Sequence, residues 1–234
     1  MLDHLSTTTA LTIALMSATG ALADSTVTPV GVMGLFHSDS PTAITLDRTA
    51  LAALGCSVRR SGIIGAAQGD IGLEQPNQFA LLACDTSVLS DRSSRAHLAA
   101  LAPSSDTLAV LEGDLIDFPV QAAKGPISDR QYVFKISYYN NQDVNARDAE
   151  LARIDAKAET LEDTYVTESF VGVDYALGMP TPDEVVILYY DDAETGDRFR
   201  NANSDFLSEI GVFNATHLIS TIYYVGQAGP KTDG

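Results

Sequence analysis

The sequence predicts an α+β fold made of two tandem modules, each with the element order βαββαβ. Residues 131–227 show strand and helix patterns in that order. The order recurs in residues 24–120, with third strands beginning roughly 50 residues after first strands. Residues 121–130 lie between the two, contain a Gly-Pro pair and are predicted to form a linker. With 45% hydrophobic residues, the chain can bury a sizeable core.

The second module begins where the hydrophobic pattern changes from a period of two to helical spacing. Tyr132, Phe134, Ile136 and Tyr138 alternate along a strand with one buried face. Asp143 stands where it can cap the helix that follows. Further along, the pattern predicts strands at 164–177 and 184–190, a helix from Asp191 or Asp192 to a stop at Gly211, and a last strand at 216–225.

The first module is predicted by the same reasoning. Its strands are expected at 27–37, 56–68, 79–85 and 107–115, with a short helix at 46–55 and a second helix at 90–103. Residues 228–234 are expected to form a disordered tail.

The two cysteines test this arrangement. In a βαββαβ sheet the second and third strands are antiparallel neighbours, so the start of one lies beside the end of the other. Cys56 opens the second strand and Cys84 closes the third. The sequence therefore predicts a Cys56–Cys84 disulfide. The competing interpretation is a reactive thiol, but neither cysteine has an adjacent His or basic residue to lower its pKa.

The amino-terminal residues 1–23 resemble a secretory signal peptide. An apolar run is followed by the small-x-small pattern Ala21-Leu22-Ala23, which predicts cleavage before Asp24. An uncleaved anchor is the alternative, although the apolar run is shorter than the roughly 20 residues that a bilayer requires. We expect a periplasmic or secreted protein with no membrane association after cleavage. That location is oxidising and agrees with a disulfide.

Charge excludes one class of partner. The formal net charge is −17, and the 14 Lys and Arg residues are spread along the chain. Binding a nucleic-acid backbone requires clustered basic residues, so we expect no nucleic-acid partner. No motif in the sequence has metal-ligand spacing, and no phosphate loop or dinucleotide fingerprint occurs. Neither a metal nor a cofactor is therefore expected.

Three segments resemble the dimeric α/β-barrel superfamily, which includes stress-responsive barrel proteins, antibiotic-biosynthesis-type monooxygenases and EthD-like proteins. They are "YVFKISYYN" at 132–140, "EVVILYYDD" at 184–192 and "STIYYVGQ" at 220–227. The resemblance implies two ferredoxin-like sheets packed as a barrel, here both from one chain. It also implies ligands bound either between sheet and helices or inside the barrel.

Candidate site residues are tyrosines and histidines. Tyr138, Tyr190 and Tyr223 belong to three adjacent pairs near strand ends, and strand alternation allows one member of each pair to line a ligand cleft. The alternative is that these tyrosines fill a core. His37, at the end of the first strand, and His217, at the start of the last, are the candidate proton acceptors, although a surface position is the simpler explanation for either one.

These features favour an exported protein that binds a small apolar or aromatic ligand in a Tyr-lined cleft. One alternative is a cofactor-independent oxygenase or isomerase of the kind the resemblance implies. Another is an interaction module that docks a partner on an exposed sheet face. A His or Asp facing the same pocket as the tyrosines would favour an enzyme. The sequence leaves the oligomeric state open.

Overall fold

The computed structural model describes residues 28–39, 44–69, 74–89, 105–118 and 125–229. Strands in these residues close into one antiparallel barrel with the order β1-β3-β2-β8-β5-β7-β6-β4. Their bounds are β1 Val30–His37, β2 Cys56–Gln68, β3 Gln78–Cys84, β4 Asp106–Asp117, β5 Gln131–Tyr139, β6 Val166–Leu177, β7 Glu184–Tyr190 and β8 Leu218–Ala228.

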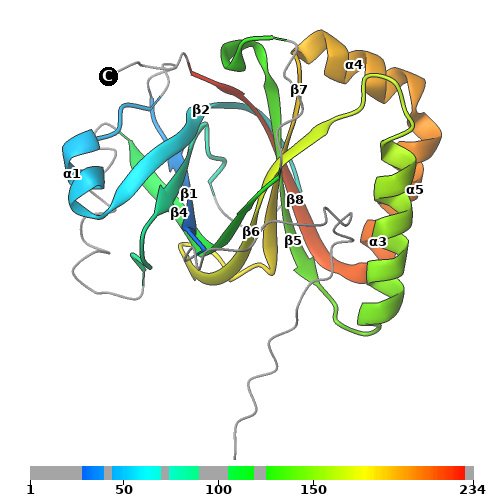
Figure 1. Ribbon diagram of the computed structural model, residues 1–234, viewed down its shortest axis with the longest axis horizontal. Helices are drawn as coiled ribbons and strands as arrows, with labels where there is room; N and C mark the ends of the chain where they lie inside the picture. The colour runs from blue at the N-terminus through cyan, green and yellow to red at the C-terminus, as the bar shows by residue number, and fades with distance from the viewer. Residues whose placement is uncertain (1–27, 40–43, 70–73, 90–104, 119–124, 230–234) are drawn as a thin grey trace, which may run out of the picture.

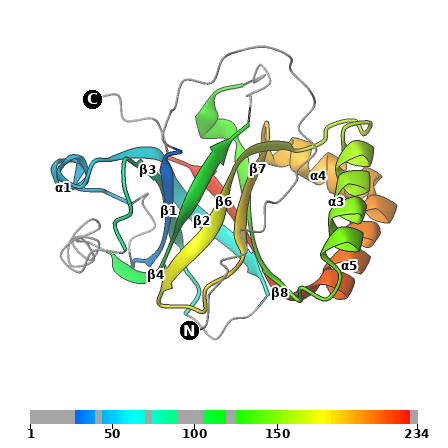
Figure 2. The ribbon, with the colours of Figure 1, turned by 60° about the horizontal axis from the view of Figure 1, so that its bottom comes forward.

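The helices lie on two opposite sides of this barrel, as Figures 1 and 2 show. Helix α1 (Arg48–Ala53) flanks β1, β2 and β3 on one side. Helices α3 (Val144–Ala158), α4 (Ala193–Ala202) and α5 (Ser204–His217) cover the other, and a short 3-10 turn, η1 (Ile127–Asp129), precedes β5. Aspartates cap three of these helices, because the side chains of Asp47, Asp143 and Asp192 accept hydrogen bonds from backbone amides of the first turn.

The α+β class and the Asp143 cap are confirmed, but the last helix differs from the prediction. Instead of one helix ending at Gly211, two helices meet at Asn203, and Gly211 lies inside α5. Phe206, Phe213 and His217 form a buried stripe along α5. Burying this stripe outweighs the roughly 1 kcal/mol penalty of an interior glycine. His217 is consequently the last residue of α5 and not a residue of the final strand.

The strands of the two halves follow one spatial order. The first half is arranged β4-β1-β3-β2 and the second β8-β5-β7-β6, and pairing of β2 with β8 and of β4 with β6 closes the barrel. A glycine stands at each junction: a Cβ on Gly62 would lie 2.0 Å from the Gln227 carbonyl oxygen, and one on Gly113 would lie 1.6 Å from that of Gly172. Close backbone approach at both junctions thus requires a residue without a side chain.

Several predicted segments lie outside the described residues. These are the signal peptide 1–23, the helix at 90–103, residues 121–124 of the linker and residues 230–234 of the tail. No helix among the described residues is both long enough and apolar enough to cross a membrane.

Side chains fill the barrel interior. Tyr132, Phe134 and Ile136 of β5 point inward and are 0% exposed. The ring centroids of Phe79 and Phe134 lie 4.4 Å apart across the interior. The interior is therefore a packed core of the kind that small barrels have.

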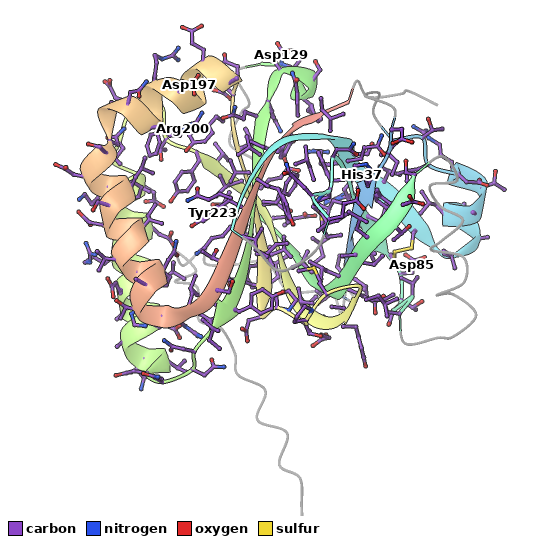
Figure 3. All side chains as sticks on the ribbon, turned by 180° about the vertical axis from the view of Figure 1, so that it is seen from behind. His37, Asp85, Asp129, Asp197, Arg200 and Tyr223 are labelled. Atoms are coloured by element: carbon purple, nitrogen blue, oxygen red, sulfur yellow. A yellow bond between two sulfur atoms is a disulfide. The ribbon has the colours of Figure 1, made fainter. Side chains whose placement is uncertain are left out.

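The predicted disulfide is confirmed. Cys56 and Cys84 are directly opposite each other in the β2–β3 ladder, with Cα atoms 4.0 Å apart, and their sulfurs are bonded. Figure 3 shows the bridge beside Asp85, on the side of the molecule that carries α1. Both cysteines are buried there with Val32, Leu82 and other apolar residues under α1.

Candidate functional site

The sheet face beneath α3 and α5 is less completely buried than the face that lines the barrel. On β5 the barrel-facing Phe134 and Ile136 are 0% exposed, whereas the helix-facing Val133 and Lys135 are only half-buried. The same alternation occurs on β7 and β8. The helices thus bury this face less completely than the strands bury the barrel interior.

We call this region the helix-facing layer. It consists of Val133, Lys135, Ser137 and Tyr139 of β5; Glu184, Val186, Leu188 and Tyr190 of β7; Tyr223 and Val225 of β8; and the facing side chains of α3 and α5.

The margins of the helix-facing layer are apolar. Phe199 of α4 and Phe206 and Phe213 of α5 pack with Ile154 of α3 in one buried cluster that includes Tyr190. Tyr190 and Phe199 have ring centroids 5.6 Å apart. These aromatic contacts hold the helices against the sheet at its edges and leave the polar groups in the middle.

The middle of the layer contains a polar row set by strand register. Ser137 faces Glu184 on β7 and Thr221 on β8, and Lys135 faces Tyr223 on β8. The Nζ atom of Lys135 lies 5.4 Å from the centre of the Phe213 ring. Burial lowers the pKa of Lys135 because the charged ammonium is poorly hydrated there, although two nearby carboxylates act in the opposite direction.

Two buried polar atoms of this layer have no hydrogen-bond partner among the described residues. They are the Ser137 Oγ, on a residue that is 0% exposed, and the Asn214 Oδ1. The other side of the Asn214 amide donates to the Tyr223 hydroxyl at 2.8 Å. A buried polar group without a partner is rare in native proteins and commonly marks the place of a water or ligand.

Two further polar pairs border this row. The Tyr139 hydroxyl donates to Glu184 Oε1 at 2.8 Å, and burial together with the Glu184 carboxylate raises the pKa of Tyr139. The His217 Nε2 lies 3.0 Å from Glu150 Oε2 on α3, and the imidazole is 5.0 Å from the Phe213 ring. A carboxylate therefore orients His217 at the base of the two helices.

The structure brings together some of the predicted site residues and separates others. Tyr190 and Tyr223 lie in the helix-facing layer, and Figure 3 shows Tyr223 between β8 and the helices. Tyr138 points to the other side of the sheet, where it packs against the barrel core and its hydroxyl donates to the Pro180 carbonyl. The three tyrosines therefore do not line one cleft.

The two candidate histidines also lie in different parts of the molecule. His217 borders the helix-facing layer, whereas His37 lies at the end of β1, which β3 and β2 separate from β8. The His37 Nε2 is 3.6 Å from Glu74, and its Nδ1 is 3.3 Å from the Gln75 carbonyl. Figure 3 shows His37 in the half of the barrel away from α3 and α5.

Sequence reasoning missed Lys135, Ser137 and Asn214. The strand pattern of β5 places Lys135 and Ser137 opposite Phe134 and Ile136, and such a polar face is normally solvent-exposed. Only the arrangement of α3 and α5 over that face shows that it is covered. The sequence signal that could have indicated a covered polar face was a strand with one polar face followed by an amphipathic helix.

A second cluster of buried polar side chains lies at one end of the barrel. Glu168 Oε1 lies 2.9 Å from Arg60 Nε, and Glu168 Oε2 accepts from the Tyr132 hydroxyl at 2.9 Å and from Arg130 Nη1 at 3.4 Å. The Arg130 guanidinium stacks 4.0 Å from the centre of the Tyr189 ring. Each of these groups contacts another member, so we interpret the cluster as structural.

An acidic hollow of about 480 Å³ opens on the surface near the start of α4. Two of its acidic residues already have structural roles: Asp192 caps α4, and Asp163 accepts from Arg198 at 2.9 Å. No cluster of three or more His, Cys, Asp and Glu side chains in the described part of the chain is arranged to hold a metal ion.

Comparison with known proteins defines the class of fold. No protein-family model matches the chain, and no curated protein sequence does. Two variants of the chlorite dismutase from Candidatus Nitrospira defluvii superpose with TM-scores of 0.53 and 0.51 at 13% and 12% identity. The matches cover 86% and 87% of this chain and 92% of each dismutase chain. An anthrone oxidase-like protein matches with a TM-score of 0.49 at 11% identity, over 87% of this chain and 92% of its own.

The two chlorite dismutase structures therefore share the fold of this chain, and the sequence resemblance likewise implies a barrel, which the strands form. The resemblance seen in the sequence therefore agrees with the fold. At such low identity the likeness concerns the fold alone.

Proposed function

We propose that this protein binds a small, neutral molecule with an aromatic or apolar body and a hydroxyl group in the helix-facing layer. The observation that carries the proposal is the pair of unpartnered buried atoms, Ser137 Oγ and Asn214 Oδ1, in a region whose apolar walls remain half-buried. The proposal retains an apolar or aromatic ligand and moves its site from three tyrosines to this layer.

The chemistry of the two atoms selects the ligand. Asn214 Oδ1 can only accept a hydrogen bond, and Ser137 Oγ can donate or accept one. A ligand hydroxyl can donate to the first while accepting from the second. Each buried polar atom left unpaired destabilises the protein by about 1 to 3 kcal/mol, so such a ligand gains affinity from satisfying both. Val133, Val186 and Leu188 offer apolar contacts to the ligand body.

Binding of 2-naphthol, measured by titration calorimetry, tests the proposal. Its matched control is 2-methoxynaphthalene, which has the same ring system and no hydroxyl donor. We expect 2-naphthol to bind and the methoxy compound to bind at least about tenfold more weakly, because the missing donor leaves Asn214 Oδ1 unpaired. Equal affinity, or no binding by either compound, would contradict the proposal.

Replacement of Ser137 by Ala provides a first mutational prediction. Because the hydroxyl has no protein partner among the described residues, we expect S137A to raise the free energy of unfolding of the ligand-free protein by about 1 kcal/mol. The same change should weaken 2-naphthol binding about fivefold to tenfold. S208A, at an exposed position of α5, should change neither quantity. Loss of stability in S137A would indicate that a tightly held water satisfies this atom.

A cofactor-independent oxygenase or isomerase is the second candidate function. The observation that favours it is the His217–Glu150 pair, since a carboxylate-oriented imidazole is a competent proton acceptor. Its position beside the layer that contains Tyr190 and Tyr223 supports this candidate. If this function is correct, incubation with 2-naphthol consumes oxygen or yields a product, whereas a pure binder returns the compound unchanged.

A docking role has less support. The large hydrophobic residues that are exposed among the described residues lie on separate elements, namely β2, β4, β6, α5 and β8. They do not favour one contiguous sheet face. The inward face of the barrel sheet is occupied by its own core.

We propose that the two halves are tandem copies of one ferredoxin-like module. The strand orders β4-β1-β3-β2 and β8-β5-β7-β6 support a duplication because each reads fourth, first, third, second within its own half. Superposing the Cα atoms of the two strand sets tests this, and a fit no better than between unrelated four-stranded sheets would argue against it.

We also propose that the protein is exported to a periplasmic or extracellular space. The Ala21-Leu22-Ala23 pattern supports this, as does the Cys56–Cys84 disulfide, since disulfides persist in oxidising compartments. Intact-mass measurement of the protein from its natural host should give a chain that begins at Asp24. Recovery of residues 1–23 in the mature protein would refute the cleavage site.

A further inference from the structure

Lys135 occupies an unusual position for a lysine. The chain has four lysines, at positions 124, 135, 157 and 231, and Lys135 is in the middle of β5 under helices α3 and α5. It is half-buried, with its Nζ over the Phe213 ring and its strand neighbours Tyr223 and Val186 on either side. The amine therefore projects into the helix-facing layer beside the Phe213 ring.

The surroundings of Lys135 favour a neutral amine more than a surface site does. The poor hydration of the buried ammonium lowers the pKa of Lys135, and the carboxylates of Glu184 on β7 and Asp155 on α3 only partly offset this. Lys157 on α3 provides a contrast, because its ammonium forms an ion pair with Glu209. A lysine becomes a nucleophile when its proton is lost near neutral pH.

The groups needed for proton transfer lie on the same face as Lys135. Glu184 is buried and faces Ser137 directly across the β5–β7 ladder, and Ser137 is two residues from Lys135 on the same side of β5. The Ser137 hydroxyl has no partner among the described residues, so it can hydrogen-bond to a ligand oxygen next to the amine. An amine, a carboxylate and an uncommitted hydroxyl thus converge on one region.

We propose that Lys135 Nζ forms an imine with small aromatic or apolar aldehydes and ketones that enter the helix-facing layer. The inference rests on the proposed function in one respect: the carbonyl compound uses the same ligand space. It adds a covalent step and a substrate class, because a carbonyl oxygen accepts the hydrogen bond that the Ser137 hydroxyl can donate.

The step is balanced without any further reactant. The neutral amine attacks the carbonyl carbon, a C–N bond forms, and the carbonyl electron pair moves to oxygen, which takes up a proton. The Glu184 carboxylate takes the proton that leaves the amine nitrogen and returns it to this oxygen. The resulting carbinolamine loses its hydroxyl with a proton as water, and a C=N bond replaces the C–O bond. One carbonyl compound and one lysine therefore give one imine and one water, with no oxidation or reduction.

Reductive trapping tests the inference. The full mature protein is incubated at pH 7 with 2-naphthaldehyde and cyanoborohydride, which reduces the imine to a stable secondary amine, and labelled positions are identified by peptide mapping. We expect Lys135 to be labelled severalfold faster than Lys157, because burial lowers the pKa of Lys135 and so increases the fraction of neutral amine. Mapping also separates Lys135 from the α-amino group, which titrates near neutral pH in any protein.

Two variants and a competitor complete the design. Lys135→Arg should remove the fast labelling while keeping the charge, and Lys157→Arg should leave it intact. Excess 2-naphthol should slow labelling of Lys135 and leave that of Lys157 unchanged. This competition uses the parent protein, so it decides the question even if Lys135→Arg fails to fold.

The outcomes separate the two proposals. Equal labelling of all four lysines, or an unlabelled Lys135 in a protein that binds 2-naphthol, overturns the imine and leaves the binding function in place. Absence of both 2-naphthol binding and Lys135 labelling overturns both. Fast labelling of Lys135 that 2-naphthol does not slow also counts against the inference, because the aldehyde would then be reaching the amine outside the proposed ligand space.

Discussion

Replacing Glu168 with Gln is expected to destabilise the protein by about 3 to 5 kcal/mol, the range measured when one partner is removed from a buried ion pair. Glu168 and Arg130 have side chains that are 8% and 4% exposed, and Arg60 approaches from β2 with 22% exposure. Arg130 Nε has no partner among the described residues, so Glu168 and the Tyr189 ring are what stabilise its charge. A neutral amide would leave two guanidinium groups without a counter-charge at the end of the barrel.

The same end of the barrel offers a matched control. Arg59 and Asp117 also form an ion pair, but each side chain is 44% exposed. Exposed pairs contribute at most about 1 kcal/mol, because water solvates both charges when the pair is broken. Urea unfolding of E168Q and D117N should therefore separate the two clearly. If both variants lose less than about 1 kcal/mol, the Glu168 cluster is solvated and does not help to hold the barrel closed.

Local sequence patterns predicted the strands well for reasons that the structure makes clear. Strand β2 has the predicted bounds, Cys56–Gln68, and β7 has the bounds of the apolar run Glu184–Tyr190. Both are set by features within a few residues: a glycine-preceded start for the first and flanking turn residues for the second. The helix cap at Asp143 could also be predicted from the sequence, because capping depends on the first turn of the helix alone.

Closure of the barrel and the position of the site depend on contacts that no local pattern encodes. The junction glycines Gly62 and Gly113 look like ordinary strand interruptions, and only the pairing of β2 with β8 and of β4 with β6 explains them. Alternation correctly divided β5 into two faces, but it did not say that helices cover the face with Lys135 and Ser137. Tyr138 and Tyr223 were grouped because both are near strand ends, and their opposite orientation follows from the register of β5 against β8.

Removal of the disulfide is expected to lower the free energy of unfolding by about 3.5 kcal/mol in the chain-entropy account of a closed loop of this size. The bridge closes a loop with a sequence separation of 28 and joins the first residue of β2 to the last residue of β3. Because the β2–β3 ladder continues for six further pairs, from Ser57 opposite Ala83 to Ile63 opposite Gln78, the barrel should still form without the bond. The effect should appear as a lower urea midpoint with a single cooperative transition.

The measurement compares three proteins: the oxidised parent, the parent unfolded in the presence of a reductant, and the double variant C56A and C84A. The reduced parent retains both side chains. Its loss of unfolding free energy therefore measures the contribution of the covalent bond alone. The double variant also loses packing in the cluster that Val32 and Leu82 form with Leu51 of α1, where Cys84 is 1% exposed. We therefore expect the double variant to be somewhat less stable than the reduced parent, and both to be clearly less stable than the oxidised protein. Two titratable thiols in the unreduced, unfolded parent would show that the bond does not form, and the pairing of Cys56 with Cys84 would then depend on the strand register alone.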